Sequence, residues 1–258
     1  MNHGTTAVDR YVEKSLASVQ GYLTTLDARV VAALLSLQLQ KQIAGHLCEI
    51  GVHHGRLFLM LALARRAGER ALAIDLFEDD AINTNTQHAG RDRALFRNAR
   101  RLGIEFLEEE VWKTSSFEVQ PSQILKRTTG RIRFFSVDGC HLYDAVENDL
   151  NLAEGTLGDE GIIAIDDFFN VDWADVSFAT SDFLRRAKGM RAFAITSSKL
   201  FVAPAAAAEK YLSALRGRPG LGRLSTVQIM GRDVLALRQG TLKKGYEAIR
   251  ELLAKRAS

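Results

Sequence analysis

The chain has 258 residues, of which 47% are hydrophobic, and a formal net charge of +3. This composition suits an ordinary folded core, and the charge is too close to balance to indicate nucleic acid or an anionic membrane as a partner. The longest apolar runs are too short to span a bilayer, and the chain does not open with the basic and apolar segments of a secretory signal.

The two cysteines, Cys48 and Cys140, are too few for a disulfide framework, so we expect a reducing, cytoplasmic location. Prolines are scarce and no Ser/Gly-rich linker or internal repeat divides the chain, which predicts one domain. Its expected parts are an N-terminal helical segment at 1–45, a core at 46–204 and a C-terminal extension of helix and hairpin at 205–258.

The N-terminal segment is predicted to be helical. Apolar residues between Val8 and Leu16 recur at helical spacing, so this stretch is expected to pack as a helix or a lid. Asp27 is the expected N-cap of a second helix, 28–44, which Gly45 ends.

A buried strand at 46–52 then leads through a glycine turn into an apolar helix that Gly68 ends. A strand, a glycine turn and a helix in this order begin many nucleotide-binding units. In this chain Gly51 and Gly55 would let the backbone of the turn pass close to a ligand. The next strand, 71–77, ends near Asp75, at the distance where an acidic residue usually binds a ribose.

The stretch that follows is harder to interpret. Residues 78–91 are polar and lack periodicity, which predicts either a functional or a disordered loop. After it we expect a helix at 92–102, a third strand at 104–109, a loop at 112–117 and a short helix at 121–127.

The central feature of the sequence is a strand–helix–strand unit at 131–167. The strand 132–137 ends at Asp138, with His141 three residues on, and the strand 161–165 ends at the pair Asp166–Asp167. Both strands point the same way, so their carboxyl ends meet at one edge of the sheet, where ligands bind in open α/β folds. Three carboxylates and an imidazole are therefore expected at that edge.

The remaining elements are predicted as a helix at 175–188, a hairpin at 191–196 and 199–203, a helix at 205–216, a hairpin at 225–230 and 233–237, and a helix at 242–255. The alternation predicts an α/β fold, a Rossmann-like three-layer sandwich. Its seven-stranded mixed sheet is expected to be mostly parallel, with an antiparallel C-terminal strand.

Four segments, CEIGVHHG, AIDLF, FFSVDGCH and AIDDFFN, together resemble the class I S-adenosylmethionine-dependent methyltransferases over roughly residues 27–203. A closer similarity is to the metal-dependent O-methyltransferases that act on sugars of macrolides and related glycosides. Two features of the turn after the first strand differ from known motifs. His53 stands where that family often has a small residue, and the turn lacks the Gly-x-Gly-x-x-Gly spacing of dinucleotide sites, which argues against NAD.

The resemblance implies roles for individual residues. It implies that the donor contacts Glu49, the two turn glycines Gly51 and Gly55, the ribose-binding Asp75, and Ser115 near the adenine. It further implies that Mg²⁺ is bound by Asp138, Asp166 and Asp167, and that His141 acts as the base with Asp138 beside it.

This assignment is chemically reasonable, because a sugar hydroxyl is a weak acid. A bound Mg²⁺ lowers the pKa of such a hydroxyl and usually keeps positions open for substrate oxygens. An imidazole such as that of His141 then takes the proton. The expected partner is a small-molecule or glycoside acceptor, whose identity the sequence does not give, and homo-oligomerisation is left open.

Simpler interpretations of the same residues remain. Asp138 could only terminate a strand, Asp166–Asp167 could be a solvated turn, and His141 could be an ordinary polar residue. Glu49 could pair with Arg56 or Lys41. At the level of the whole protein, the alternatives are a metal-independent methyltransferase or a hydroxylase on the same fold, or a non-catalytic cofactor-binding subunit.

Overall fold

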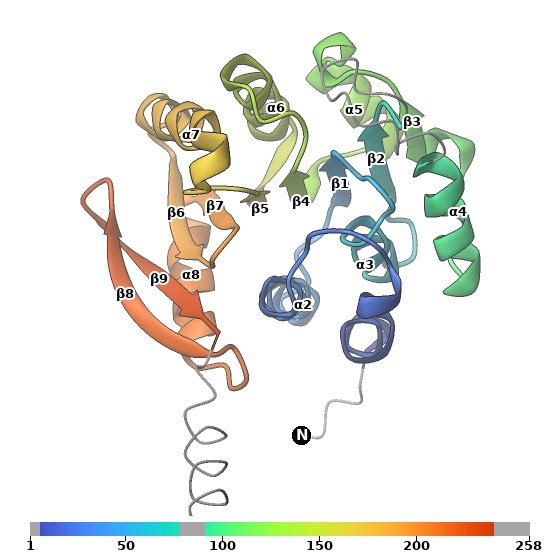
Figure 1. Ribbon diagram of the computed structural model, residues 1–258. Helices are drawn as coiled ribbons and strands as arrows, with labels where there is room; N and C mark the ends of the chain where they lie inside the picture. Colours follow the sequence, from blue (N-terminus) through green and yellow to red (C-terminus); the bar gives the residue numbers. More distant parts are fainter. Residues whose placement is uncertain (1–5, 78–90, 240–258) are drawn as a thin grey trace, which may run out of the picture.

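The computed structural model describes residues 6–77 and 91–239 (Figure 1). Within these residues nine strands form one mixed sheet in the order β3-β2-β1-β4-β5-β7-β6-β9-β8. The strands are β1 (His46–Ile50), β2 (Ala71–Asp75), β3 (Val111–Lys113), β4 (Ile132–Val137), β5 (Leu157–Ile165), β6 (Met190–Ile195), β7 (Leu200–Pro204), β8 (Arg223–Ile229) and β9 (Arg232–Arg238).

The first five strands are parallel, as the sequence predicts. β7 runs antiparallel to both β5 and β6, so the predicted hairpin is confirmed. The sheet is wider than the seven strands expected, because β9 pairs parallel with β6 and brings the hairpin partner β8 with it.

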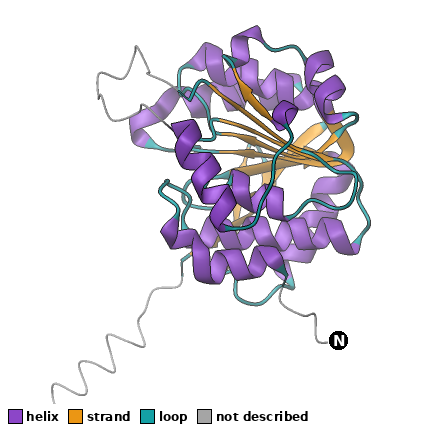
Figure 2. Ribbon diagram, turned by 90° about the vertical axis from the view of Figure 1, so that its right-hand side faces the viewer, coloured by secondary structure: helices purple, strands orange, loops and turns teal. Residues whose placement is uncertain are grey.

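The helices lie in two layers around the sheet (Figures 1 and 2). In Figure 1, α5, α6 and α7 lie on one face, and α2, α3 and α8 lie on the other. The helices are α1 (Ala7–Arg10), α2 (Thr25–Gln40), α3 (Phe58–Leu63), α4 (Arg91–Arg101), α5 (Pro121–Thr128), α6 (Tyr143–Thr156), α7 (Ala174–Arg186) and α8 (Ala205–Arg216).

Each face of the sheet has its own hydrophobic core. Successive side chains of a strand point to opposite faces, and in β4 Phe134 packs with the α2, α3 and α8 side whereas Phe135 packs with the α5, α6 and α7 side. Both rings are fully buried. This double burial explains why the central strands are nearly continuous apolar runs in the sequence.

The third strand is the element that the sequence analysis places wrongly. It lies at Val111–Lys113, overlapping the start of the loop expected at 112–117, and not at 104–109. Residues 108–110 instead form a single 3₁₀ turn, in which the Glu110 carboxylate accepts from the backbone N–H of Leu107. The same buried carboxylate accepts from Arg65 and from the Ala71 N–H, so it fixes this turn against the start of β2.

The ends of α2 also differ from the prediction. Its N-cap is Thr24, whose hydroxyl accepts from the Asp27 N–H, so Asp27 lies in the first turn and does not cap the helix. The helix ends at Gln40, before Gly45, and Gln42 adopts a positive φ of 56°.

Within the described residues, no helix is long and apolar enough to cross a bilayer. The predicted helix at 242–255 and nearly all of the predicted loop at 78–91 lie outside the described residues.

Candidate functional site

The site lies at the edge of the sheet where the parallel strands β1, β2, β4 and β5 end. Asp138 and Asp166 follow the last residues of β4 and β5, and both extend the strand ladder by one hydrogen bond. The Asp138 N–H donates to the Ile50 carbonyl at 2.9 Å, and the Asp166 N–H donates to the Val137 carbonyl at 3.0 Å. The sheet thereby fixes the backbone from which these two carboxylates project.

The two glycines of the turn after β1 are required by contacts within the protein. Gly51 has a φ of +81°, and a Cβ there would lie 1.8 Å from the Asp138 carbonyl oxygen. Gly55 has a φ of +86°, and a Cβ there would lie 2.4 Å from the Leu95 side chain. The sequence predicts that these glycines allow close approach to a ligand, whereas in the structure they allow close approach to the Asp138 backbone and to helix α4.

Asp75, the last residue of β2, holds this turn through its carboxylate. One oxygen accepts from the backbone N–H groups of Val52 at 2.6 Å and His53 at 2.8 Å. The other accepts from the Phe77 N–H at 2.7 Å. Three backbone donors therefore orient the residue expected to bind a ribose, and Oδ1, which accepts only one of them, retains capacity for a further hydrogen bond.

Glu49 is a buried acid next to the turn, with 2% of its surface exposed. Its Oε2 atom has no hydrogen-bond partner within the described part of the chain. Burial raises the pKa of Glu49 well above its usual range, against the opposing positive charge of Lys199. The expected alternative partner Arg56 donates instead to the Gly21 carbonyl, which ties the N-terminal segment to the glycine turn.

A lysine that the sequence analysis misses lies between the two strand-end carboxylates. Lys199 precedes β7, its side chain is 1% exposed, and its Nζ lies 2.8 Å from Asp166 Oδ1 and 3.5 Å from Asp138 Oδ2. Loss of solvation and the adjacent Asp166 carboxylate raise the pKa of Asp138 well above its usual range. A signal in the sequence exists, because the antiparallel partner of β5 must begin at the edge where β5 ends.

The third predicted ligand, Asp167, faces His141 instead. His141 Nε2 lies 3.0 Å from Asp167 Oδ2, and Asn170 donates to the other oxygen of Asp167 at 2.8 Å. The adjacent imidazole of His141 lowers the pKa of Asp167. The imidazole of His141 also stacks on Trp173, with ring centroids 4.5 Å apart, so its orientation is fixed on two sides.

These contacts test whether the three carboxylates fit a magnesium ion. Mg²⁺ requires oxygen ligands that converge in octahedral geometry. Asp138 and Asp166 flank an ammonium group, whereas Asp167 is engaged by His141 and Asn170. Among the residues that the structure describes, no group of three or more His, Cys, Asp or Glu side chains is arranged to hold a metal. The arrangement seen here therefore does not fit the predicted ion.

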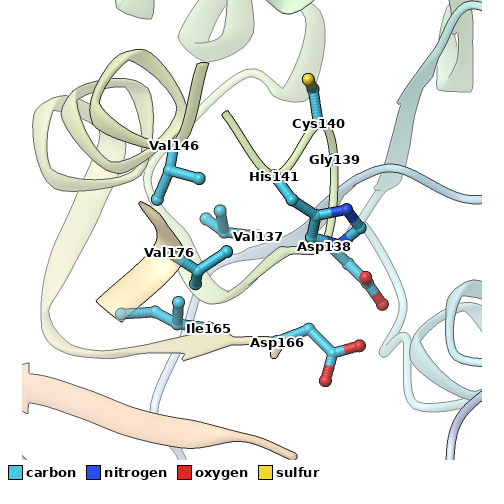
Figure 3. A pocket seen from close by; sticks show the side chains of 9 residues that line it. All are labelled: Val137, Asp138, Gly139, Cys140, His141, Val146, Ile165, Asp166 and Val176. Carbon is cyan, nitrogen blue, oxygen red and sulfur yellow. The ribbon is translucent and has the colours of Figure 1, made fainter. Parts of the chain in front are cut away.

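A small pocket opens beside these groups (Figure 3). In Figure 3 the side chains of Asp138, His141 and Asp166 gather on one side, and Cys140 points away from them. Apolar side chains, Val137, Val146, Ile165 and Val176, form the opposite wall. The pocket thus combines a carboxylate pair and an imidazole with an apolar surface.

Ser115, the last of the predicted site residues, follows β3 at the same edge of the sheet. Its hydroxyl accepts from the Phe117 N–H, 3.4 Å away, and caps a short 3₁₀ turn. The preceding N–H, that of Thr114, donates to the Asp75 carbonyl at 3.1 Å. Ser115 therefore lies near the end of β2, with its side chain in a local capping contact.

Comparison with known proteins agrees with this geometry. Residues 48–168 match the model of a family described as a methyltransferase domain. No curated protein sequence matches the chain significantly.

Among solved structures, the chain is similar to the apo structure of CalS11, a TDP-rhamnose 3'-O-methyltransferase in calicheamicin biosynthesis. Identity is 15% and the TM-score 0.54, with 76% of this chain and 91% of that chain covered. It is also similar to the O-methyltransferase NovP, with 16% identity, a TM-score of 0.51, and 71% and 83% covered.

A third similar structure is the O-methyltransferase TomG from Streptomyces achromogenes, involved in tomaymycin synthesis and solved with S-adenosylmethionine. Identity is 13% and the TM-score 0.51, with 77% of this chain and 87% of that chain covered. At these identities the likeness concerns the fold, and the family match supplies the domain. Residues 48–168 therefore match a methyltransferase domain, and the described residues adopt the α/β, Rossmann-like fold that the sequence predicts.

Proposed function

We propose that this protein transfers the methyl group of S-adenosylmethionine to a hydroxyl of a sugar or of a glycosylated metabolite. The observation that carries the proposal is the pairing of His141 with Asp167 beside the Asp138 and Asp166 carboxylates, at the sheet edge next to the glycine turn. The name of CalS11, a sugar O-methyltransferase of similar fold, supports the choice of acceptor.

The donor is assigned to the ends of β1, β2 and β3. Asp75 accepts a hydrogen bond from a ribose hydroxyl through the remaining lone pair of Oδ1, and Ser115 lies toward the adenine. Glu49 has a buried oxygen without a partner within the described residues, which suits the ammonium group of the methionine part. The turn at Gly51 and Gly55 supplies the backbone surface on which the donor lies, and the S-adenosylmethionine complex of TomG supports this cofactor.

The reacting hydroxyl of the acceptor is assigned to the small pocket beside His141, with the rest of the acceptor outside it. The imidazole takes the proton of the acceptor hydroxyl as the methyl carbon is attacked, and the Asp167 carboxylate stabilises the imidazolium that forms. Asp138, at the same rim, orients the hydroxyl by accepting a hydrogen bond. Methyl transfer needs little further covalent help, because the sulfonium already activates the methyl carbon and the protein holds the two reactants in line.

Magnesium stays a prediction from the sequence. Mg²⁺ would lower the pKa of the acceptor hydroxyl when bound, but its three proposed ligands are engaged elsewhere in this structure.

We also infer that residues 1–258 form a single domain, which the continuous sheet from β3 to β8 supports. We further infer a cytoplasmic location, which the two unpaired cysteines Cys48 and Cys140 support.

A methylation screen tests the proposal. The full chain is incubated with S-adenosylmethionine bearing a labelled methyl group and with panels of free sugars, nucleotide sugars and glycosides. Label transfer to a hydroxyl of a glycosidic acceptor supports the proposal. Label found only on nitrogen or carbon acceptors would contradict the assignment to O-methylation.

A further inference from the structure

A tight turn places Lys199 beside Asp138 and Asp166, the carboxylates at the ends of β4 and β5. Its carbonyl accepts from the Thr196 N–H at 2.9 Å, and its own N–H donates to the Thr196 hydroxyl at 3.0 Å. The next residue, Leu200, is paired with Ile165 at the end of β5. The turn is therefore held at both ends, and the register places Lys199 opposite the start of the Asp166–Asp167 pair.

The surroundings of Lys199 combine full burial with several negative charges. A buried ammonium group is costly unless it is paired. Its Nζ lies 2.8 Å from Asp166 Oδ1 and 3.5 Å from Asp138 Oδ2, so the ammonium group faces two carboxylates. Lys199 thus places a cation between the carboxylates of Asp138 and Asp166.

We infer that the Lys199 ammonium is the resident cation of this rim, holding Asp138 and Asp166 in place where the sequence predicts Mg²⁺. This inference rests on the proposed function. Lys199 is a positioning residue, because its buried Nζ contacts the two carboxylates and not the pocket. A divalent ion between the same carboxylates would lie close to an ammonium that has no route to solvent, and like charges at such distances repel strongly.

The inference predicts that removing Lys199 creates a metal site. Mn²⁺ is the probe, since it prefers the same oxygen ligands as Mg²⁺ and is followed by electron paramagnetic resonance. We expect the full-length wild-type protein to show no saturable Mn²⁺ site, and Lys199→Ala to gain one that is at least about tenfold tighter than any residual binding of Mn²⁺ by the wild type. Lys199→Arg keeps the charge and should not gain the site, whereas Lys199→Ala combined with Asp166→Asn should lose it again.

A saturable Mn²⁺ site in the wild type that Lys199→Ala leaves unchanged or weakens would overturn the inference. If Lys199→Ala does not fold, the wild-type and Lys199→Arg titrations still decide. A saturable site in either contradicts the inference, and its absence in both supports it. A second measurement uses an acceptor found in the methylation screen. Turnover by the wild type should persist in excess EDTA, and a loss that Mg²⁺ restores would overturn the inference.

A different result would contradict the proposed function without bearing on the role of Lys199. A wild-type protein that neither binds S-adenosylmethionine nor methylates any acceptor would contradict the proposed function. The Mn²⁺ titrations do not depend on either property, so they report on the resident cation alone.

Discussion

Gly51 and Asp138 lie in direct backbone contact, and this contact joins the turn after β1 to the end of β4. A Cβ at Gly51 would overlap the Asp138 carbonyl oxygen at 1.8 Å, and backbone cannot move aside as a flexible side chain can. The glycine therefore sets the distance between the two halves of the site. This explains a glycine at this position without any ligand contact.

Gly51→Ala should lower both the stability and the affinity for S-adenosylmethionine. We expect a loss of at least about 3 kcal/mol in the free energy of unfolding, because overlap is added to the cost of the left-handed backbone. Gly68→Ala is the matched control, with a φ of +82° and no atom within 4 Å of the added Cβ. It should cost only about 1–2 kcal/mol. Urea unfolding and calorimetry of both variants check this, and equal losses would contradict the proposed contact.

His141→Ala should reduce turnover strongly and leave donor affinity nearly unchanged. Removing a general base typically lowers the rate by about 10²- to 10⁴-fold, and no donor contact is assigned to His141. Asp167→Asn should lower turnover less, because it removes the partner of the imidazole and keeps the base. Turnover and donor binding are measured separately with an acceptor from the screen. Wild-type turnover in His141→Ala would remove His141 from the mechanism.

Asp149, buried on α6, should make stability depend on pH. Burial raises the pKa of Asp149 from 3.8 to about 6, although hydrogen bonding at Ser116 and Asn148 opposes the shift. Because the folded state binds the proton more tightly, this group stabilises the fold below pH 3.8, and the contribution is lost as the pH rises through about 6.

Asp149→Asn should therefore raise the free energy of unfolding at neutral pH, by up to roughly 3 kcal/mol, and change it little near pH 4. Glu154→Gln, an exposed change on the same helix, should stay within about 0.5 kcal/mol at both values. Denaturant unfolding across this range gives the comparison. A gain that is the same at both pH values would show that burial of the charge is not the cause.

The Arg133–Glu69 ion pair should support stability and not donor binding. Its side chains are 3% and 9% exposed and 2.9 Å apart, and Arg133 also donates to Gln38. Glu69→Gln leaves a buried guanidinium without its counter-charge, which typically costs about 3–5 kcal/mol. Arg133 lies near the start of β4, at the end of the strand remote from Asp138.

The control for this pair is Lys210→Gln, which breaks the exposed ion pair with Glu160 and should cost at most about 1 kcal/mol. Thermal unfolding in the presence and absence of S-adenosylmethionine separates the two effects. Donor-induced stabilisation should survive in Glu69→Gln, and its loss would contradict the assignment of the donor to the other edge.

The elements with a clear apolar period are the ones that the sequence predicts well. The bounds of β4 and α8 agree with the prediction, because an apolar run between polar residues and a helix between Pro204 and Gly217 leave little freedom. The predicted position of the third strand is wrong, because a strand of three residues is too short to show a hydrophobic period. Its place depends on the buried Glu110, which the sequence presents as one of three adjacent glutamates.

The candidate site shows the same division. Strand ends bring Asp138 and Asp166 together, as topology requires, and His141 follows from its spacing. Asp167 turns toward His141 because its backbone adopts a φ of 54°, which residue order alone does not reveal. Lys199 could not be predicted as a site residue, because a lysine beside a serine turn is normally solvated. Its burial depends on the register of β7 against β5.

The most direct test of the account is a calorimetric titration of S-adenosylmethionine into the full-length protein, first with Mg²⁺ and then with EDTA. The account predicts saturable binding of one donor molecule per chain in both conditions, because the donor lies on the glycine turn and on Asp75 and not on a metal. The absence of binding in either condition would contradict the assignment of this site to S-adenosylmethionine.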